Sequence, residues 1–135
     1  MNAVLPVAER MLGQFGEFYP YGGYMKPDGE IVHIGAADEE TDHPKSKDLL
    51  DALRDSLSKM AATGGCKAAA IVFDVRVVPP NAEDNTDAIQ VCLEHVAGYS
   101  AEVFVPYKIG QDRLARYGVM FAQEGKREIF GEPRV

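Results

Sequence analysis

The sequence predicts an α+β fold in which two helices cover one face of a five-stranded antiparallel sheet. The expected order is helix, two strands, helix and three strands, with room for one further edge strand. Two segments repeat apolar residues every three or four positions, as amphipathic helices do. Five shorter segments alternate apolar and polar residues and have short connections, which is typical of an antiparallel sheet with one buried face. Because both apolar helix stripes need a partner, we expect both helices on that face.

The first helix is expected near the amino terminus. Pro6 is compatible with a first helical turn, and Gly16 is a residue type that commonly follows a last turn. The apolar stripe of this helix consists of Val4, Leu5, Ala8, Met11, Leu12 and Phe15.

A β-hairpin is expected from Gly16 to Gly35, with its turn at Pro27-Asp28-Gly29. Pro restricts the first corner of the turn, Asp accepts local backbone hydrogen bonds, and Gly allows a positive φ. The rings of the first arm either fill the corner next to the first helix or form a recognition surface, since Tyr is a frequent interface anchor. The Tyr19-Pro20 bond is a candidate cis bond, with trans as the default. The four rings are Phe18, Tyr19, Tyr21 and Tyr24.

The second helix is expected to begin after Pro44 and to end at Thr63-Gly64-Gly65, because glycine often follows a last helical turn. Three alternating strands follow over residues 67–78, 86–96 and 101–107, and residues 117–122 are a candidate edge strand. We expect a weakly structured tail from about residue 123. The whole chain, residues 1–135, fits a single domain, since compact domains commonly contain about 100–150 residues.

The chain is acidic, with a formal net charge of -7. Acidic residues without any Lys or Arg fill the stretches from Asp28 to Asp42 and from Asn81 to Glu102. Such a surface repels phosphate backbones, so we expect no nucleic-acid partner. It permits a basic protein as partner.

The sequence favours a cytoplasmic protein that does not associate with membranes. No apolar run approaches the ~20 residues that span a bilayer, and the first residues lack the pattern of a secretory signal. Cys66 and Cys92 lie far apart and form no C-x-x-C pair. We therefore expect no disulfide framework and a reducing compartment.

No motif of a cofactor site, a metal site or a catalytic nucleophile is present. The acidic segment from Asp38 to His43 lacks the spacing of a calcium loop, and we interpret it as favouring the start of the following helix. The histidines show no paired spacing. Cys92 and His95 are three positions apart on one expected strand, so they point to opposite faces. We predict no catalytic residue, no metal and no cofactor.

The outward face of the expected sheet contains the most polar candidates. In a meander, Asp74, Arg76, Gln90 and Glu94 share this face, with Phe104 beside them. Three interpretations stay open: a solvated face with cross-strand charge pairs, a dimer interface, or a site for a polar ligand. We favour the first two. The predicted binding residues are therefore Tyr19, Tyr21, Tyr24, Asp74, Arg76, Gln90, Glu94 and Phe104.

Several short motifs between Leu12 and Tyr107 occur together. They are Phe15-Gly16-Glu17-Phe18-Tyr19-Pro20-Tyr21-Gly22, Pro27-Asp28-Gly29-Glu30, His43-Pro44, Asp74-Val75-Arg76-Val77, Thr86-Asp87-Ala88-Ile89 and Val105-Pro106-Tyr107. Together they resemble a group of small uncharacterised bacterial proteins, and the aromatic hairpin is the most specific element. The resemblance implies a bacterial cytoplasmic origin and no particular activity, cofactor or site residue.

Taken together, these patterns predict a non-enzymatic module that binds another protein or forms a homo-oligomer. An immunity or antagonist protein with a basic target is one specific form of this hypothesis. The alternative is a small ligand-binding domain or enzyme that uses the outward sheet face.

Overall fold

The computed structural model describes residues 3–16, 18–35 and 46–131, which form two helices and seven strands. The helices are α1 (Leu5–Phe15) and α2 (Ser46–Ala62). The strands are β1 (Tyr21–Met25), β2 (Ile31–Gly35), β3 (Ala68–Val77), β4 (Thr86–His95), β5 (Ser100–Ile109), β6 (Ala115–Tyr117) and β7 (Phe121–Glu124).

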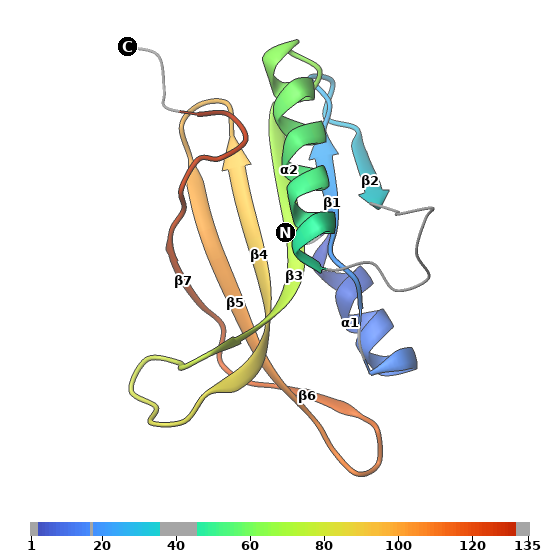
Figure 1. Cartoon of the computed structure of the whole chain (residues 1–135), viewed down its shortest axis with the longest axis vertical. Helices are drawn as coiled ribbons and strands as arrows, with labels where there is room; N and C mark the ends of the chain where they lie inside the picture. Colours follow the sequence, from blue (N-terminus) through green and yellow to red (C-terminus); the bar gives the residue numbers. More distant parts are fainter. Residues whose placement is uncertain (1–2, 17, 36–45, 132–135) are drawn as a thin grey trace.

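All strands belong to one antiparallel sheet, in the order β2-β1-β3-β4-β5. Strands β6 and β7 both pair with the outer side of β5 (Figure 1). The α+β class is confirmed, whereas the predicted count of five strands is too low. The single candidate edge strand becomes two short ones because the chain leaves the ladder near Pro106, which has no N–H to donate. The pair formed by Gly118 and Pro106 therefore has a single hydrogen bond, from the Gly118 N–H to the Pro106 carbonyl at 2.8 Å.

The predicted hairpin turn forms as expected. The Gly29 N–H donates to the Lys26 carbonyl at 2.9 Å, and Asp28 Oδ1 accepts from the Glu30 N–H at 2.9 Å. Gly29 has a φ of 94°, a conformation that glycine adopts without steric cost. Pro20 follows a trans bond, since the described residues contain no cis peptide.

The two helices lie on opposite faces of the sheet, which corrects the prediction that they share one face. Ala70 and Val72 of β3 pack in one cluster with α1. Ala69 and Ile71 pack in a second cluster with α2. Successive strand residues point to opposite faces, so β3 is buried on both. Figure 1 shows α2 in front of β1 and β3, and α1 behind them toward the lower end of β1. We call these sides the α1 face and the α2 face.

Two adjacent glycines of β1 allow both helices to approach this strand. A Cβ atom on Gly22 would lie 3.5 Å from Leu53 Cδ2 of α2 and 3.0 Å from the Ala70 carbonyl oxygen. A Cβ atom on Gly23 would lie 2.9 Å from Val4 Cγ1, at the start of α1. Larger residues here would separate the helices from the sheet.

The start of α1 is fixed by Tyr21, which points to the α1 face. The Tyr21 hydroxyl accepts a hydrogen bond from the Ala8 N–H at 2.9 Å and donates one to the Val4 carbonyl. The Ala8 N–H and the Val4 carbonyl are the i→i−4 pair that closes the first turn of α1, and the Tyr21 hydroxyl bridges them.

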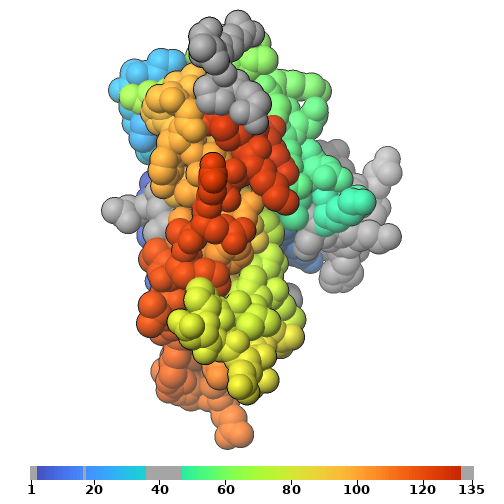
Figure 2. Space-filling model, turned by 90° about the vertical axis from the view of Figure 1, so that its left-hand side faces the viewer, coloured from blue at the N-terminus to red at the C-terminus, as the bar shows by residue number. Residues whose placement is uncertain are grey.

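The segment after about residue 123 is held in place rather than weakly structured, which corrects the predicted tail as far as residue 131. Strand β7 continues to Glu124, and Ile129 is buried against Leu53 and Leu57 on the α2 face. Figure 2 shows this red segment running between the orange β5 and the green α2. The segment covers part of the α2 face beside α2, through Ile129 and Phe130.

We expect Gly22→Ala and Gly23→Ala to lower the free energy of unfolding by about 1–3 kcal/mol, the usual cost of overpacking. Gly13→Ala is the matched control, because a Cβ atom there meets nothing within 4 Å. Inside helix α1 it should stabilise the protein by up to about 1 kcal/mol. Urea unfolding measures all three. Unchanged midpoints for both β1 variants would contradict the close-approach argument.

We expect Tyr21→Phe to cost about 1–2 kcal/mol, because it removes both hydroxyl hydrogen bonds. Burial raises the pKa of Tyr21 from 10.0 to about 12. The folded state therefore holds the phenol proton more tightly than the unfolded state. The Tyr21 contribution is complete below pH 10 and is lost as the pH rises toward 12. The stability difference between wild type and Tyr21→Phe should narrow over that range, with Tyr19→Phe as an exposed control. A constant difference would exclude this coupling.

Candidate functional site

The predicted polar residues do not share one face of the sheet. Asp74 is paired with Ile89 and lies on the α1 face, as does Arg76. Gln90 and Glu94 lie on the α2 face, and Phe104 is directly opposite Gln90. In the sequence, polar and apolar residues alternate in both β3 and β4, which suggested that the polar residues of the two strands share one outward face. The β3–β4 register in the structure differs from the expected one by one residue, which moves the polar residues of one strand to the opposite face of the sheet.

The two polar residues on the α1 face have structural partners. Asp74 Oδ1 accepts a hydrogen bond from the buried Tyr107 hydroxyl at 2.8 Å. Burial, and then this bond, raise the pKa of Tyr107, and burial raises the pKa of Asp74. Arg76 donates to Asn85 Oδ1 at 2.8 Å and to Asp87 Oδ1 at 3.2 Å. These contacts hold the ends of β3, β4 and β5 together and leave no converging pair for acid–base chemistry.

Glu94 on the α2 face is a buried carboxylate with a structural role. Both of its oxygens accept from the Ile129 N–H at 3.0 Å, and Oε1 also accepts from the Phe130 N–H at 3.1 Å. It thereby holds the carboxy-terminal segment on the sheet. The same segment is tied to α2 by an Arg54–Glu128 ion pair of 2.7 Å.

The other two candidates on this face are also occupied within the fold. Phe104 is buried and stacks on Phe121, with ring centroids 5.0 Å apart. Gln90 Nε2 lies 3.5 Å from Cys92 Sγ. Phe104 is therefore part of the core, whereas Gln90 is half-buried beside Cys92.

The three candidate tyrosines have three different environments. Tyr21 belongs to the core beneath α1, as the packing interpretation predicted. Tyr24 is half-buried on the α2 face, next to the α2 cluster. Tyr19 is 51% exposed, so among these three it is the one with an open surface.

The described residues provide no obvious chemistry. They contain no group of three or more His, Cys, Asp or Glu side chains placed to hold a metal ion. The predicted acidic segment from Asp38 to His43 lies outside the described residues. Burial raises the pKa of both thiols, Cys66 and Cys92, which disfavours the nucleophilic thiolate. Neither described helix is long and apolar enough to cross a membrane.

The outer side of β2 is an open strand edge within the described residues. Lys26 N–H bonds the Glu30 carbonyl at 2.8 Å, which makes this a hydrogen-bonded pair of the β1–β2 ladder. Hydrogen-bonded and non-hydrogen-bonded pairs alternate along an antiparallel ladder. The N–H and C=O groups of Val32 and Ile34 therefore also bond to β1. Ile31, His33 and Gly35 therefore direct their N–H and C=O groups away from the sheet. We call this row of backbone groups the open edge.

The open edge lacks the features that usually protect a sheet edge. Natural edge strands often contain Lys, another charged residue, Pro or a bulge. No charged residue or Pro occurs between Ile31 and Gly35. At the opposite side of the sheet, two short strands cover β5 instead.

Two apolar depressions adjoin the open edge on the α1 face. His33 Nε2 lies 2.8 Å from the Ala3 carbonyl oxygen, so the chain that enters α1 crosses beside the middle of β2. On one side of this crossing is a groove of about 600 Å³, which we call the aromatic groove. Its lining residues are Val7, Met11, Phe15, Phe18, Tyr19, Pro20, Tyr21, His33, Ile34 and Gly35.

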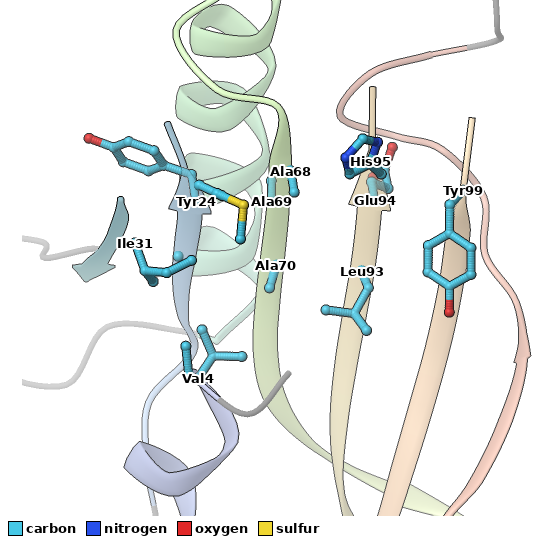
Figure 3. Close-up of a pocket in the computed structure, with 13 residues that line it drawn as sticks. Val4, Tyr24, Ile31, Ala68, Ala69, Ala70, Leu93, Glu94, His95 and Tyr99 are labelled. Atoms are coloured by element: carbon cyan, nitrogen blue, oxygen red, sulfur yellow. The ribbon is translucent and has the colours of Figure 1, made fainter. Parts of the chain in front are cut away.

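On the other side of the crossing is a smaller depression of about 200 Å³, which we call the alanine hollow. Figure 3 shows Ala68 and Ala70 on its β3 side, with Ile31 and Leu93 approaching from opposite sides and Val4 at the lower end. Tyr24 points away from it, and His95 lies at its upper end (Figure 3). The hollow exists because α1 begins at the level of Val4 and the β3 side chains are small. It has room for about one apolar side chain.

The open edge was not among the predicted site residues. The sequence does contain a signal for it, since Ile31–Gly35 is an apolar strand without a charged residue or proline. That signal has meaning only once the strand order is known. The order β2-β1-β3 depends on long-range pairing, which places the second arm of the hairpin outermost.

We expect Glu94→Gln to lower the free energy of unfolding by about 1–3 kcal/mol, because a carboxamide places an NH2 group against backbone donors. The amides of Ile129 and Phe130 should also lose protection from hydrogen exchange. Glu124→Gln, in the exposed part of β7, is the control and should change neither quantity. Full protection of both amides in Glu94→Gln would show that this carboxylate does not hold the segment.

The comparisons with known proteins supply no relative from which a function could be inferred. The resemblance to small bacterial proteins stays a prediction, and the open edge with its two depressions is argued from this chain's own residues. No protein-family model matches the chain, and no curated protein or solved structure shows significant similarity to it.

Proposed function

We propose that this protein is a non-catalytic binding module that holds an extended segment of another protein along the open edge. The observation that carries the proposal is the outward direction of the backbone groups of Ile31, His33 and Gly35. An extended segment can continue a sheet at such an edge through main-chain hydrogen bonds, while neighbouring depressions receive its side chains.

Stable binding at this edge requires both main-chain hydrogen bonds and the burial of apolar side chains. Each backbone hydrogen bond contributes about 0.5–1.5 kcal/mol net, because the same groups bond to water in the free protein. Burial of apolar side chains contributes about 25 cal/mol per Å² of surface removed from water. An edge without an adjoining apolar surface would therefore bind weakly, and this edge has the groove on one side and the hollow on the other.

A second copy of the chain is a less favourable occupant. Each copy has a formal net charge of -7, so two copies repel each other, whereas a basic segment is attracted. We therefore propose a different protein with basic residues, and homo-oligomerisation becomes an outcome of the test.

The proposal includes a bacterial cytoplasmic setting and, in its most specific form, an immunity or antagonist role. The two free cysteines and the net charge of -7 support this setting and a basic target. The alternative function is binding of a small apolar ligand in the alanine hollow. The apolar lining of that hollow favours it, and its size limits the ligand.

Hydrogen exchange at β2 tests the proposal. In the free protein, the amides of Val32 and Ile34 should be protected, whereas those of Ile31, His33 and Gly35 should exchange quickly. The probe is the peptide acetyl-Lys-Lys-Val-Thr-Val-Thr-Val-Lys-Lys-amide, which should slow the latter three at least tenfold. The same peptide N-methylated at its valines should not, because it lacks the donors that face β2.

Two variants separate the open edge from the hollow. His33→Pro should abolish peptide binding, because it removes an N–H that points away from the sheet. His33→Ala loses the same side-chain contact with the Ala3 carbonyl but keeps the N–H, and it should still bind the peptide. Ala68→Leu fills the hollow and should weaken peptide binding without abolishing it, because the edge and the groove remain. The opposite pattern would assign the site to the hollow and reject the edge. A peptide that leaves the three amides exchanging quickly, or a dimer that already protects them, would also reject the proposal.

A further inference from the structure

We infer that the bound segment has a large aromatic side chain opposite Gly35, which enters the aromatic groove, and basic residues at the end that lies beside Asp28. This inference rests on the proposed function and specifies the partner of the same edge. It depends on three observations: the space at Gly35, the direction of that space, and the charge of the hairpin turn.

Gly35 leaves space that the fold does not need. A Cβ atom at this position would meet nothing within 4 Å, and its φ lies outside the positive range. Gly35 is therefore not required for the backbone conformation or for packing within the described residues. The residue opposite it on an added strand would have its Cβ about 4.5–5.5 Å away. With no side chain on Gly35, that residue has room to be large.

The space at Gly35 opens toward the aromatic groove. Gly35 pairs with Tyr21, whose side chain lies on the α1 face, so a side chain opposite Gly35 also points to this face. Gly35 itself lines the groove. Three large hydrophobic side chains that line it are exposed, Met11 by 37%, Phe15 by 68% and Tyr19 by 51%.

The groove suits an aromatic ring better than a small side chain. Its volume of about 600 Å³ lies within the range of about 300–1,000 Å³ found for binding pockets. Aromatic rings pair favourably in edge-to-face or offset geometry, with about 0.5–1.5 kcal/mol beyond the area they bury. Phe18 and Tyr21 already form such an edge-to-face pair in the groove wall, with centroids 6.1 Å apart.

The charge of the hairpin turn favours basic residues at the end of the segment beside it. Lys26, just before the turn, is paired with Glu30 at 3.1 Å, which leaves Asp28 without a neutralising Lys or Arg in this turn. Lys or Arg at the end of the segment beside Asp28 would complement this charge and speed association.

Tryptophan fluorescence tests the inference directly, because the protein contains no Trp. The probe is acetyl-Lys-Lys-Trp-Thr-Val-Thr-Val-Lys-Lys-amide, compared with the peptide that has Ala in place of Trp and with one that has Glu in place of every Lys. The Trp peptide should bind at least tenfold more tightly than either, with a blue-shifted emission that reports burial of the indole.

Gly35→Leu should weaken the Trp peptide at least tenfold, because the new side chain occupies the entrance of the groove. Gly13→Leu is the matched control, since that glycine also has nothing within 4 Å of a Cβ atom but lies outside the groove. The control should bind the Trp peptide as wild type does.

The outcomes separate this inference from the proposed function. If His33→Pro abolishes binding but the Trp and Ala peptides bind equally, the groove inference is wrong and the edge proposal stands. Equal binding of the Lys and Glu peptides would reject the basic residues of the segment. No binding of any peptide, whether the protein is monomeric or dimeric by analytical ultracentrifugation, would overturn both.

Discussion

The close contact of two helices with the same strand, from opposite sides, is the constraint on which the rest of this structure depends. Gly22 and Gly23 are adjacent, so one faces α2 and the other faces the start of α1. The neighbouring strand β3 is buried on both faces and has small alanines where the helices approach. With larger residues at these positions, the two cores could not form on one thin sheet.

Burial on both faces determines where the molecule stays open. The helices pack on β1 and β3, the carboxy-terminal segment covers a further part of the α2 face, and β6 and β7 cover the outer side of β5. Within the described residues, the outer side of β2 is left with unpaired backbone groups. The path of the chain into α1, next to His33, divides the adjoining surface into the aromatic groove and the alanine hollow.

Polar residues that look functional in the sequence serve the fold in the structure. Glu94 holds the carboxy-terminal segment, Asp74 holds Tyr107, and Arg76 joins the turn between β3 and β4. In the described part of the chain, every buried side-chain nitrogen or oxygen has a hydrogen-bond partner. No buried polar side chain is left without a structural partner there, so outward backbone groups and apolar surface are the features that remain for binding.

The sequence by itself determined the α+β class, the helix positions and the hairpin turn, because these follow from local periodicity and from residues such as Pro27 and Gly29 that restrict or extend φ. Only the tertiary structure decided the helix faces, the pairing of Ile71 with Cys92 rather than with Val91, and the outermost position of β2. Alternation shows that a strand has two kinds of face, but a one-residue shift in register exchanges them. The partner of each face, and therefore the candidate site, depends on contacts between residues far apart in the chain.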